Sequence, residues 1–179
     1  MFTKQEYLEE YKNNNKKANI TKLFGYIEER LDHNSSLGCS VARFENFQLT
    51  PTLWKILTND KHFKELCKCR GYDLTFLDED GSWVDITSAK AKADAEIWNK
   101  IFKNNDVNYF FNVIMGRLFA VGLEKNIKHP YYTIHKDCCS SIVWELANNK
   151  TFLEKIVENG WDFDYGSELL PYIQIKGKW

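Results

Sequence analysis

The stretch "NNKTFLEKIVENGWDF" at residues 148–163 repeats, without a gap, the pattern of "NDKHFKELCKCRGYDL" at residues 59–74. Over the longer pair 57–74 and 146–163, seven of eighteen positions are identical, where chance gives about one. The matching character continues downstream to Ile86 and Ile175. The sequence therefore predicts two copies of one structural unit, with two coincidentally similar helix–strand joints as the alternative.

The first copy contains signals for helices followed by a hairpin. Thr50 and Pro51 begin a helix, because threonine caps free N–H groups and proline fits the first helical position. A second helical stretch ends at Gly71, where a residue with positive φ is favoured. The segments "YDLTFL" (72–77) and "SWVDIT" (82–87) then predict a β-hairpin around the turn "DEDG".

Each copy also has a helix and an extended piece upstream. In the first copy, apolar residues of 20–31 occupy one helical face, and the extended piece "GCSVARF" (38–44) follows. In the second copy, the helix from Val107 to Leu123 is apolar nearly all round. Such a helix is expected to bury both faces, either between layers of the chain or across a homodimer, and Gly116 permits a close helix approach.

These elements predict an α+β fold in which a helix–strand–helix–strand–strand unit occurs twice. A capping box at residues 3–6 predicts a helix near 3–13, outside the repeat, and Ser88 caps a helix that connects the units. The predicted divisions are an N-terminal helical extension at 1–17, a first α+β unit at 18–87, a connecting helix at 88–106 and a second α+β unit at 107–179.

Composition limits the class of protein. The chain has 179 residues, of which 44% are hydrophobic, so it can build one or two small cores. Its formal charge of −1 argues against general nucleic-acid binding. The five cysteines are odd in number and lack the spacing of a disulfide framework, which suggests that the protein occupies a reducing compartment. The N-terminus is polar and the most apolar run contains Asn112 and Arg117, so we expect a cytoplasmic protein without a signal peptide or membrane span.

The sequence gives little support for a metal-binding or catalytic site. Cys67, Cys69, Cys138 and Cys139 could hold zinc, but two residues two apart on a helix point in different directions, and structural thiols are favoured. His135 and Asp137 near Cys138 or Cys139 suggest a cysteine nucleophile, yet no oxyanion loop accompanies them. The turn at Asp78 lacks the ligand spacing of a calcium loop. The sequence therefore favours a non-enzymatic protein with no catalytic residues, no metal site and no cofactor.

The two hairpins share an acidic composition. Residues 72–87 and 161–175 contain carboxylates but no lysine or arginine. The candidate partner-binding residues are Asp73, Asp78, Asp80, Asp85, Asp162, Asp164 and Glu168. A row of carboxylates would complement a basic groove on a protein partner and accelerate its capture. Ordinary solvation with protection of edge strands is the alternative.

The end of each unit resembles the close of many small accessory proteins of tailed phages and prophages, in which a helix leads through a Gly-aromatic pair into two strands. The matching residues are Leu66, Gly71, Tyr72, Leu74, Val84 and Ile86, and again Ile156, Gly160, Trp161, Phe163, Ile173 and Ile175. The tryptophan that closes the pattern in that family is absent here. The resemblance covers about half of the chain and includes no catalytic residues. It implies an accessory protein of a phage or mobile element.

These observations leave three function classes. The first is a phage-type protein that binds and inhibits a host protein or ribonucleoprotein complex of nucleic-acid processing or defence, as anti-CRISPR proteins do. The second is a nucleic-acid-binding accessory protein that uses lysine-rich helix faces, such as that of Lys61, Lys64 and Lys68. The third is a virion or assembly component, which formation of a ring or shell would favour.

Overall fold

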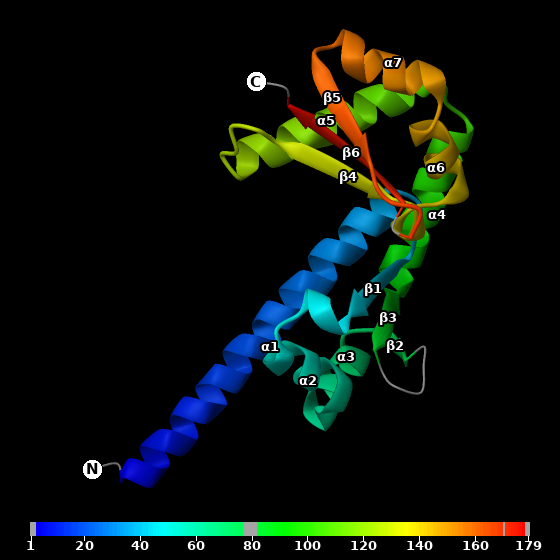
Figure 1. The fold of residues 1–179 in the computed structure, drawn as a ribbon. Coiled ribbons are helices and arrows are strands. Elements are labelled where there is room, and N and C mark those ends of the chain that lie inside the picture. Colours follow the sequence, from blue (N-terminus) through cyan, green and yellow to red (C-terminus); the bar gives the residue numbers. More distant parts are fainter. Residues whose placement is uncertain (1–2, 77–81, 170, 178–179) are drawn as a thin grey trace. The chain divides into compact units, whose positions relative to one another are not determined.

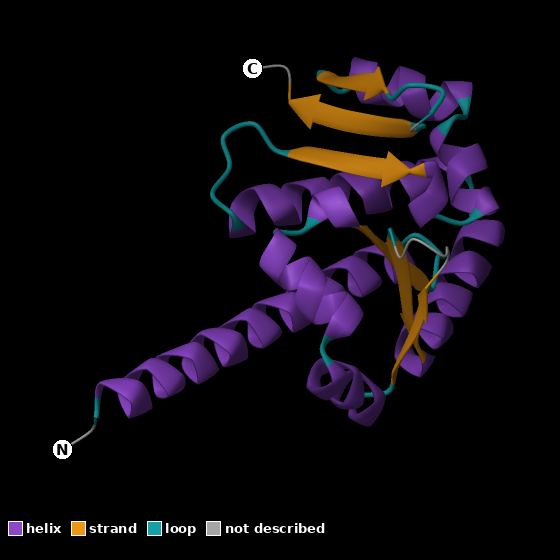
Figure 2. Cartoon of the chain, turned by 60° about the horizontal axis from the view of Figure 1, so that its bottom comes forward, coloured by secondary structure: helices purple, strands orange, loops and turns teal. Residues whose placement is uncertain are grey.

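The computed structural model describes residues 3–76, 82–169 and 171–177, and the chain divides into two compact units (Figure 1). Unit 1 comprises Met1–His33 and Ser40–Ala91, and unit 2 comprises Asn34–Cys39 and Lys92–Trp179. Each unit has its own hydrophobic core and an antiparallel sheet of three strands among its described residues (Figure 2). The predicted α+β class is confirmed.

Unit 1 contains a sheet with the strand order β1-β3-β2. Its elements are α1 (Lys4–Ser36), which continues into unit 2, β1 (Val41–Glu45), the 3-10 helix η1 (Asn46–Gln48), α2 (Pro51–Asn59), α3 (Lys61–Cys69), β2 (Tyr72–Phe76) and β3 (Trp83–Ser88). The central strand β3 places Ile86 opposite Ala42 of β1 and Leu74 of β2. Ile86 and Ala42 are buried in the core of this unit, and Leu74 packs against it.

Unit 2 contains a sheet with the order β4-β6-β5. Its elements are α4 (Ala89–Lys103), whose first residues belong to unit 1, α5 (Val107–Glu124), β4 (Tyr131–His135), the 3-10 helix η2 (Lys136–Cys138), α6 (Ser141–Ala147), α7 (Lys150–Glu158), β5 (Trp161–Tyr165) and β6 (Tyr172–Gly177). The order strand, 3-10 helix, two α-helices and two strands thus recurs in both units. That residues 57–86 superpose on 146–175 stays a prediction.

Capping explains where the predicted helices begin and end. The Thr50 hydroxyl accepts the Leu53 N–H at 3.4 Å, and Pro51 occupies the first turn of α2. After α3 the chain turns at Gly71, whose φ of 76° lies in the left-handed region that favours glycine. The equivalent turn after α7 is at Gly160, with a φ of 79°. The helix signals in the two copies of the sequence therefore act as predicted.

Two phenylalanines at matching places of the repeat are fully buried. Phe63 of α3 packs against Phe24 of α1, with ring centroids 5.0 Å apart. Phe152 of α7 packs against Phe110 of α5, also at 5.0 Å. Each ring lies in the core of its own unit and joins two of that unit's helices.

The N-terminal region differs from the prediction. The expected helix near 3–13 and the helix over 20–31 form one helix, α1, of 33 residues, because neither a proline nor a glycine interrupts the asparagine and lysine residues between them. The predicted strand at 38–44 starts only at Val41, since Gly38, with a φ of 78°, turns the chain out of α1.

The units also divide the chain differently from the predicted ranges, because the residues after Ala91 in α4 cluster with unit 2.

Helix α5 does not bury both faces within unit 2. Its buried residues are Phe110, Ile114, Met115, Leu118 and Gly122. The opposite side exposes 50% of Phe119 and 83% of Leu123. Unit 2 by itself therefore does not bury both faces of α5, and burial of the outer face by another part of the chain or across a homodimer stays a prediction. No helix in the described segments has the length and apolar character needed to cross a membrane.

Candidate protein-binding surface

Each sheet packs one face on the helices of its unit and leaves the other face uncovered by that unit's core. Along β3, for example, Val84 and Ile86 are buried, whereas Trp83 at the start of the strand is 38% exposed. The strand register defines the outward positions. The open face of unit 1 comprises Val41, Arg43, Glu45, Asp73, Thr75, Trp83, Asp85 and Thr87, and the open face of unit 2 comprises Tyr131, Thr133, His135, Asp162, Asp164, Tyr172, Gln174 and Lys176.

The structure places four of the seven predicted site residues on these open faces: Asp73, Asp85, Asp162 and Asp164. Glu168 is exposed in the loop between β5 and β6. Asp78 and Asp80 lie outside the described residues. The predicted site residues are thus distributed over two separate surfaces, one on each unit.

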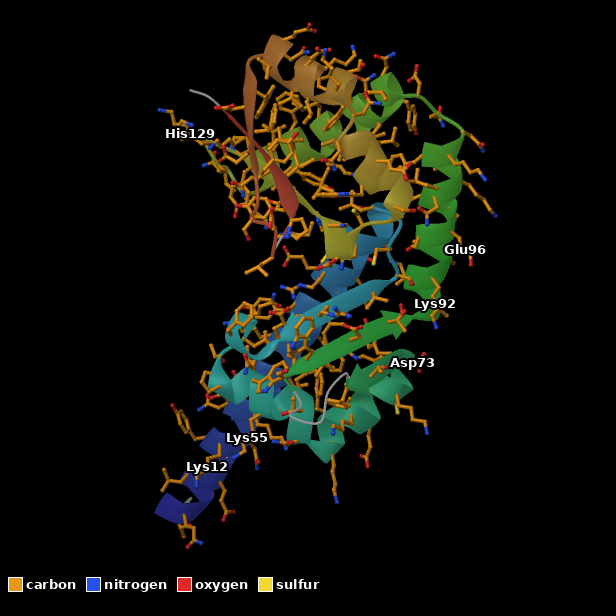
Figure 3. The ribbon with its side chains drawn as sticks, turned by 45° about the vertical axis from the view of Figure 1, so that its right-hand side comes forward. Lys12, Lys55, Asp73, Lys92, Glu96 and His129 are labelled. Carbon is orange, nitrogen blue, oxygen red and sulfur yellow. The ribbon has the colours of Figure 1, made fainter. Side chains whose placement is uncertain are left out.

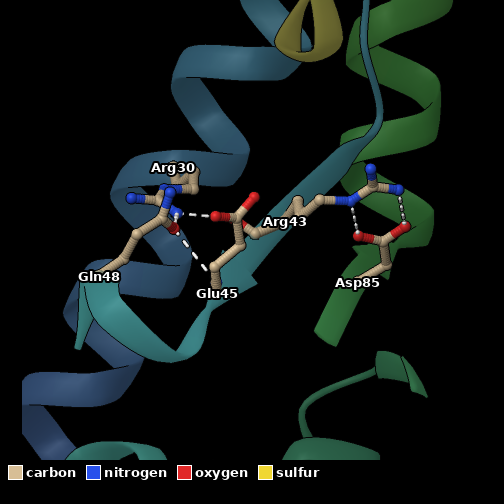
Figure 4. Close-up of polar contacts among 5 residues, drawn as sticks. All are labelled: Arg30, Arg43, Glu45, Gln48 and Asp85. Atoms are coloured by element: carbon tan, nitrogen blue, oxygen red, sulfur yellow. Dashed lines mark hydrogen bonds and ion pairs between the residues drawn. The ribbon is translucent and has the colours of Figure 1, made fainter. Parts of the chain in front are cut away.

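On unit 1, Asp85 is neutralised by a cation from the neighbouring strand (Figure 4). Arg43 of β1 donates from Nε to Oδ1 at 2.8 Å and from Nη2 to Oδ2 at 2.9 Å. This is a bidentate pair with defined geometry. The Arg43 guanidinium also lies 4.9 Å from the ring centroid of Trp83. The hairpin sequence of unit 1 contains no cation, but the three-stranded sheet does, because β1 contributes Arg43.

The backbone that presents Arg43 is held by a second set of contacts (Figure 4). Arg30 of α1 donates to the Arg43 carbonyl at 2.6 Å and to Oε1 of Gln48 at 2.7 Å. The same Gln48 oxygen accepts the N–H of Glu45 at 3.3 Å, and the Glu45 side chain accepts from the Gln48 backbone. The end of β1 is thereby fixed to α1, so the Arg43–Asp85 pair is a rigid part of the open face.

On unit 2, Lys176 of β6 pairs with Asp164 of the adjacent strand β5. The hydrogen bond from Lys176 to this carboxylate raises the pKa of the lysine above its usual value. Asp162 accepts the N–H of Phe163 at 3.0 Å. The prediction of a hairpin without cations missed Lys176, because this residue lies one position beyond residues 161–175.

Carboxylates nevertheless outnumber cations on both open faces. The ratio is three to one in unit 1 and two to one in unit 2. Among the described residues, Asp73 receives no side-chain hydrogen bond or ion pair, and it points away from the helices that carry Lys12 and Lys55 (Figure 3). Both surfaces are therefore acidic after their internal ion pairs are counted.

Aromatic side chains accompany these carboxylates. Tyr131 of unit 2 is 58% exposed, and the rings of His135 and Tyr172 pack edge to face with centroids 5.4 Å apart. In unit 1 the aromatic member is Trp83. None of these residues was among the predicted partner-binding residues, although the alternation of "YYTIH" at 131–135 indicates the outward-facing positions.

The lysine-rich helix faces are partly occupied by internal contacts. Lys16 pairs with Asp60 at 2.7 Å, and Lys64 lies 4.7 Å from the ring centroid of Phe76. Arg70 lies 3.9 Å from the ring centroid of Phe24. These cations stabilise unit 1 itself, which weakens the case that they form a phosphate-binding surface.

Cys67 and Cys139 do not have the properties of reactive thiols. Burial raises the pKa of Cys67 to about 12. Burial, followed by the neighbouring Cys39, Cys138 and Asp137, raises the pKa of Cys139 to about 12. A thiol with such a pKa is not a thiolate at neutral pH, which argues against a nucleophile at Cys139. Within the described ranges no three His, Cys, Asp or Glu side chains are grouped so that they could hold a metal ion.

One surface hollow, of about 260 Å³, lies in unit 1 between α1, β2 and the start of α4. Its charged side chains are paired with one another, since Lys90 contacts Asp32 at 2.7 Å and the Tyr72 hydroxyl donates to Glu28 at 3.2 Å. The Ser88 hydroxyl, which also lines the hollow, accepts the N–H of Ala91 at 3.1 Å, so these polar groups take part in contacts within unit 1.

Comparisons of the chain with protein-family models, with curated proteins and with solved structures found no match. We therefore infer function from the chemistry of the two open faces.

Proposed function

We propose that this chain is a non-enzymatic protein that binds a basic surface of another protein through the open faces of its two sheets. The observation that supports this function is the combination, on each uncovered sheet face, of an excess of carboxylates with exposed aromatic side chains. Aromatic residues supply most of the affinity in protein interfaces, whereas rim charges mainly set orientation and association rate. Asp73 and Asp162 are the carboxylates assigned this steering role.

The partner class that the phage-type resemblance suggests is a host protein or ribonucleoprotein complex that processes nucleic acid. Such complexes expose basic grooves, which an acidic protein can occupy in place of the nucleic acid. Inhibition by occupation of that groove, in the manner of anti-CRISPR proteins, is the mode of action we propose. The site of action is then the host cytoplasm.

A capture experiment tests this proposal. The parent chain, the variant D73K/D162K and the control E65K/E158K would be immobilised and exposed to the same host lysate. Glu65 and Glu158 are exposed on α3 and α7, so the control reverses the same number of charges away from the open faces. We expect the parent and the control to capture the same partner in equal amounts, and D73K/D162K to capture less of it in the same short exposure, because its association is slower. Identical retention by all three chains would contradict the role of the open faces.

Nucleic-acid binding is the competing function, because residues 11–27 contain four lysines and no carboxylate. Lys12 and Lys17 are exposed on α1. Under this alternative, K12E/K17E would abolish binding to nucleic acid and D73K/D162K would strengthen it. Our proposal instead predicts no binding of the parent chain to single-stranded or duplex DNA at physiological salt, where a phosphate-dependent interaction is already weakened.

A further inference from the structure

Helix α5 has an uncharged outer strip that unit 2 covers only in part, through the edge-to-face contact of Phe119 with Trp161 at 5.4 Å between ring centroids. We call these residues the α5 strip: Tyr109, Asn112, Gly116, Phe119, Ala120 and Leu123, all of which are exposed. Charged residues make up 27% of the chain, yet the strip contains none. An exposed apolar patch of this kind is typical of an interaction site. The strip lies on a helix and not on the open faces, so its role is independent of the proposed function.

Four residues of the strip occupy positions that are symmetrical about Gly116, and Phe119 has no counterpart within the strip. Tyr109 lies seven residues before this glycine and Leu123 seven after it, while Asn112 and Ala120 lie four before and four after. A second copy of α5 that crosses antiparallel at Gly116 therefore places Tyr109 opposite Leu123 and Asn112 opposite Ala120. Such self-complementarity is what a twofold interface requires.

Unit 2 gives no reason for a glycine at the centre of this helix. A Cβ atom at position 116 would meet no atom within 4 Å, and the residue has no positive φ. Glycine is among the least favourable residues for a helix interior. A helix that packs directly across this position would explain it, because the absence of a side chain allows the shortest distance between helix axes.

The ends of α5 favour the same antiparallel arrangement. Asp106 caps the N-terminus of the helix and Lys125 its C-terminus. In two antiparallel copies the helix dipoles are opposed. The dipoles therefore favour the antiparallel crossing over the parallel one.

The available area indicates a weak dimer. Tyr109, Phe119 and Leu123 are 38%, 50% and 83% exposed. With the small residues between them, the strip offers roughly 400–500 Å² in each copy if a large side chain contributes about 200 Å² when fully exposed. The total of roughly 800–1,000 Å² for two copies is within the range of weak interfaces, below that of stable ones. We propose that the α5 strip forms a homodimer in which two copies cross antiparallel at Gly116, with a dissociation constant in the micromolar range.

Sedimentation velocity of the full chain between about 5 and 200 μM tests this dimer. We expect the parent to shift from monomer to dimer across this range. The variant G116L should stay monomeric, with a dissociation constant raised at least about tenfold, because leucine blocks the crossing. Its thermal midpoint should not fall, since leucine is a better helix former than glycine and has free space. The control I97K, which adds a charge at an exposed residue of α4, should dimerise like the parent.

Disulfide cross-linking tests the crossing point. Two copies of G116C face each other at the twofold axis and should cross-link on mild oxidation, with the parent as control for the native cysteines. Two copies of L123C should not, because the antiparallel geometry separates them by about 21 Å along the helix axis. A parent that remains monomeric, a dimer that persists in G116L, or faster cross-linking of L123C than of G116C would each overturn the proposal.

Discussion

Replacement of Gly38 by alanine should be the most disruptive glycine substitution in unit 2. Gly38 has a φ of 78°, and a Cβ atom there would lie 2.1 Å from Oδ1 of Asn99 and 2.8 Å from Oγ of Ser140. Asn99 also donates from Nδ2 to the Gly38 carbonyl at 2.9 Å. The left-handed conformation costs alanine about 1–2 kcal/mol, and loss of the Asn99 hydrogen bond adds about 1 kcal/mol. We therefore expect G38A to lower the free energy of unfolding by about 2–3 kcal/mol.

Urea denaturation followed by tryptophan fluorescence and circular dichroism measures this loss. Gly160 is the matched control in the same unit, because its φ is 79° but a Cβ atom there would meet nothing within 4 Å. G160A should lose only the backbone contribution, about 1–2 kcal/mol. The double variant G38A/N99A should cost no more than G38A alone, since the Asn99 hydrogen bond is already lost and the clashing oxygen is removed. A cost for G38A no larger than for G160A would refute the close-approach explanation.

Three further predictions concern the cores, pH and thiols. F63A and F152A should each cost about 3–5 kcal/mol, and hydrogen exchange should show the lost protection first in the unit that carries the substitution. The pKa of the Asp60 carboxyl is lowered, first by the hydrogen bond from Lys16 and second by the hydrogen bond from the N–H of Phe63. The stabilisation that ionised Asp60 gives the fold is therefore complete above the unfolded pKa near 3.8 and is lost as pH falls below it. Urea titrations at several pH values should show that the free energy of unfolding falls more steeply in acid for the parent than for D60N. Alkylation at pH 7.5 should modify exposed Cys69 well before Cys139, whose pKa is about 12, and equal rates measured by mass spectrometry would contradict the burial of Cys139.

The sequence predicted those parts of the fold that depend on local signals. Thr50 and Gly71 limit the helices because caps and positive φ are local properties of residue type. The extent of α1 was missed, since a helix without a stop signal continues until Gly38, whatever the pattern of its exposed face. The apolar sequence of α5 predicted that the helix is buried on all sides. Composition does not determine which surface packs on the α5 strip.

The candidate site was predictable only in part. Side chains alternate between the two faces of a strand, so the sequence alone is sufficient to place Asp73 and Asp162 on the outward face. The neutralisation of Asp85 by Arg43 depends on the pairing of strands 42 residues apart. Register between distant strands is set by packing of the whole unit, so the surplus of carboxylates on each open face required the structure.

The association rate with the captured partner, measured by stopped flow at several salt concentrations, tests the central claim most directly. If the open faces steer binding, the rate for the parent chain should fall as ionic strength rises, because salt screens the attraction between carboxylates and a basic surface. D73K/D162K should bind more slowly at low salt and show the opposite slope, whereas E65K/E158K should follow the parent. Equal rates and equal slopes for all three chains would show that the acidic faces take no part in partner recognition.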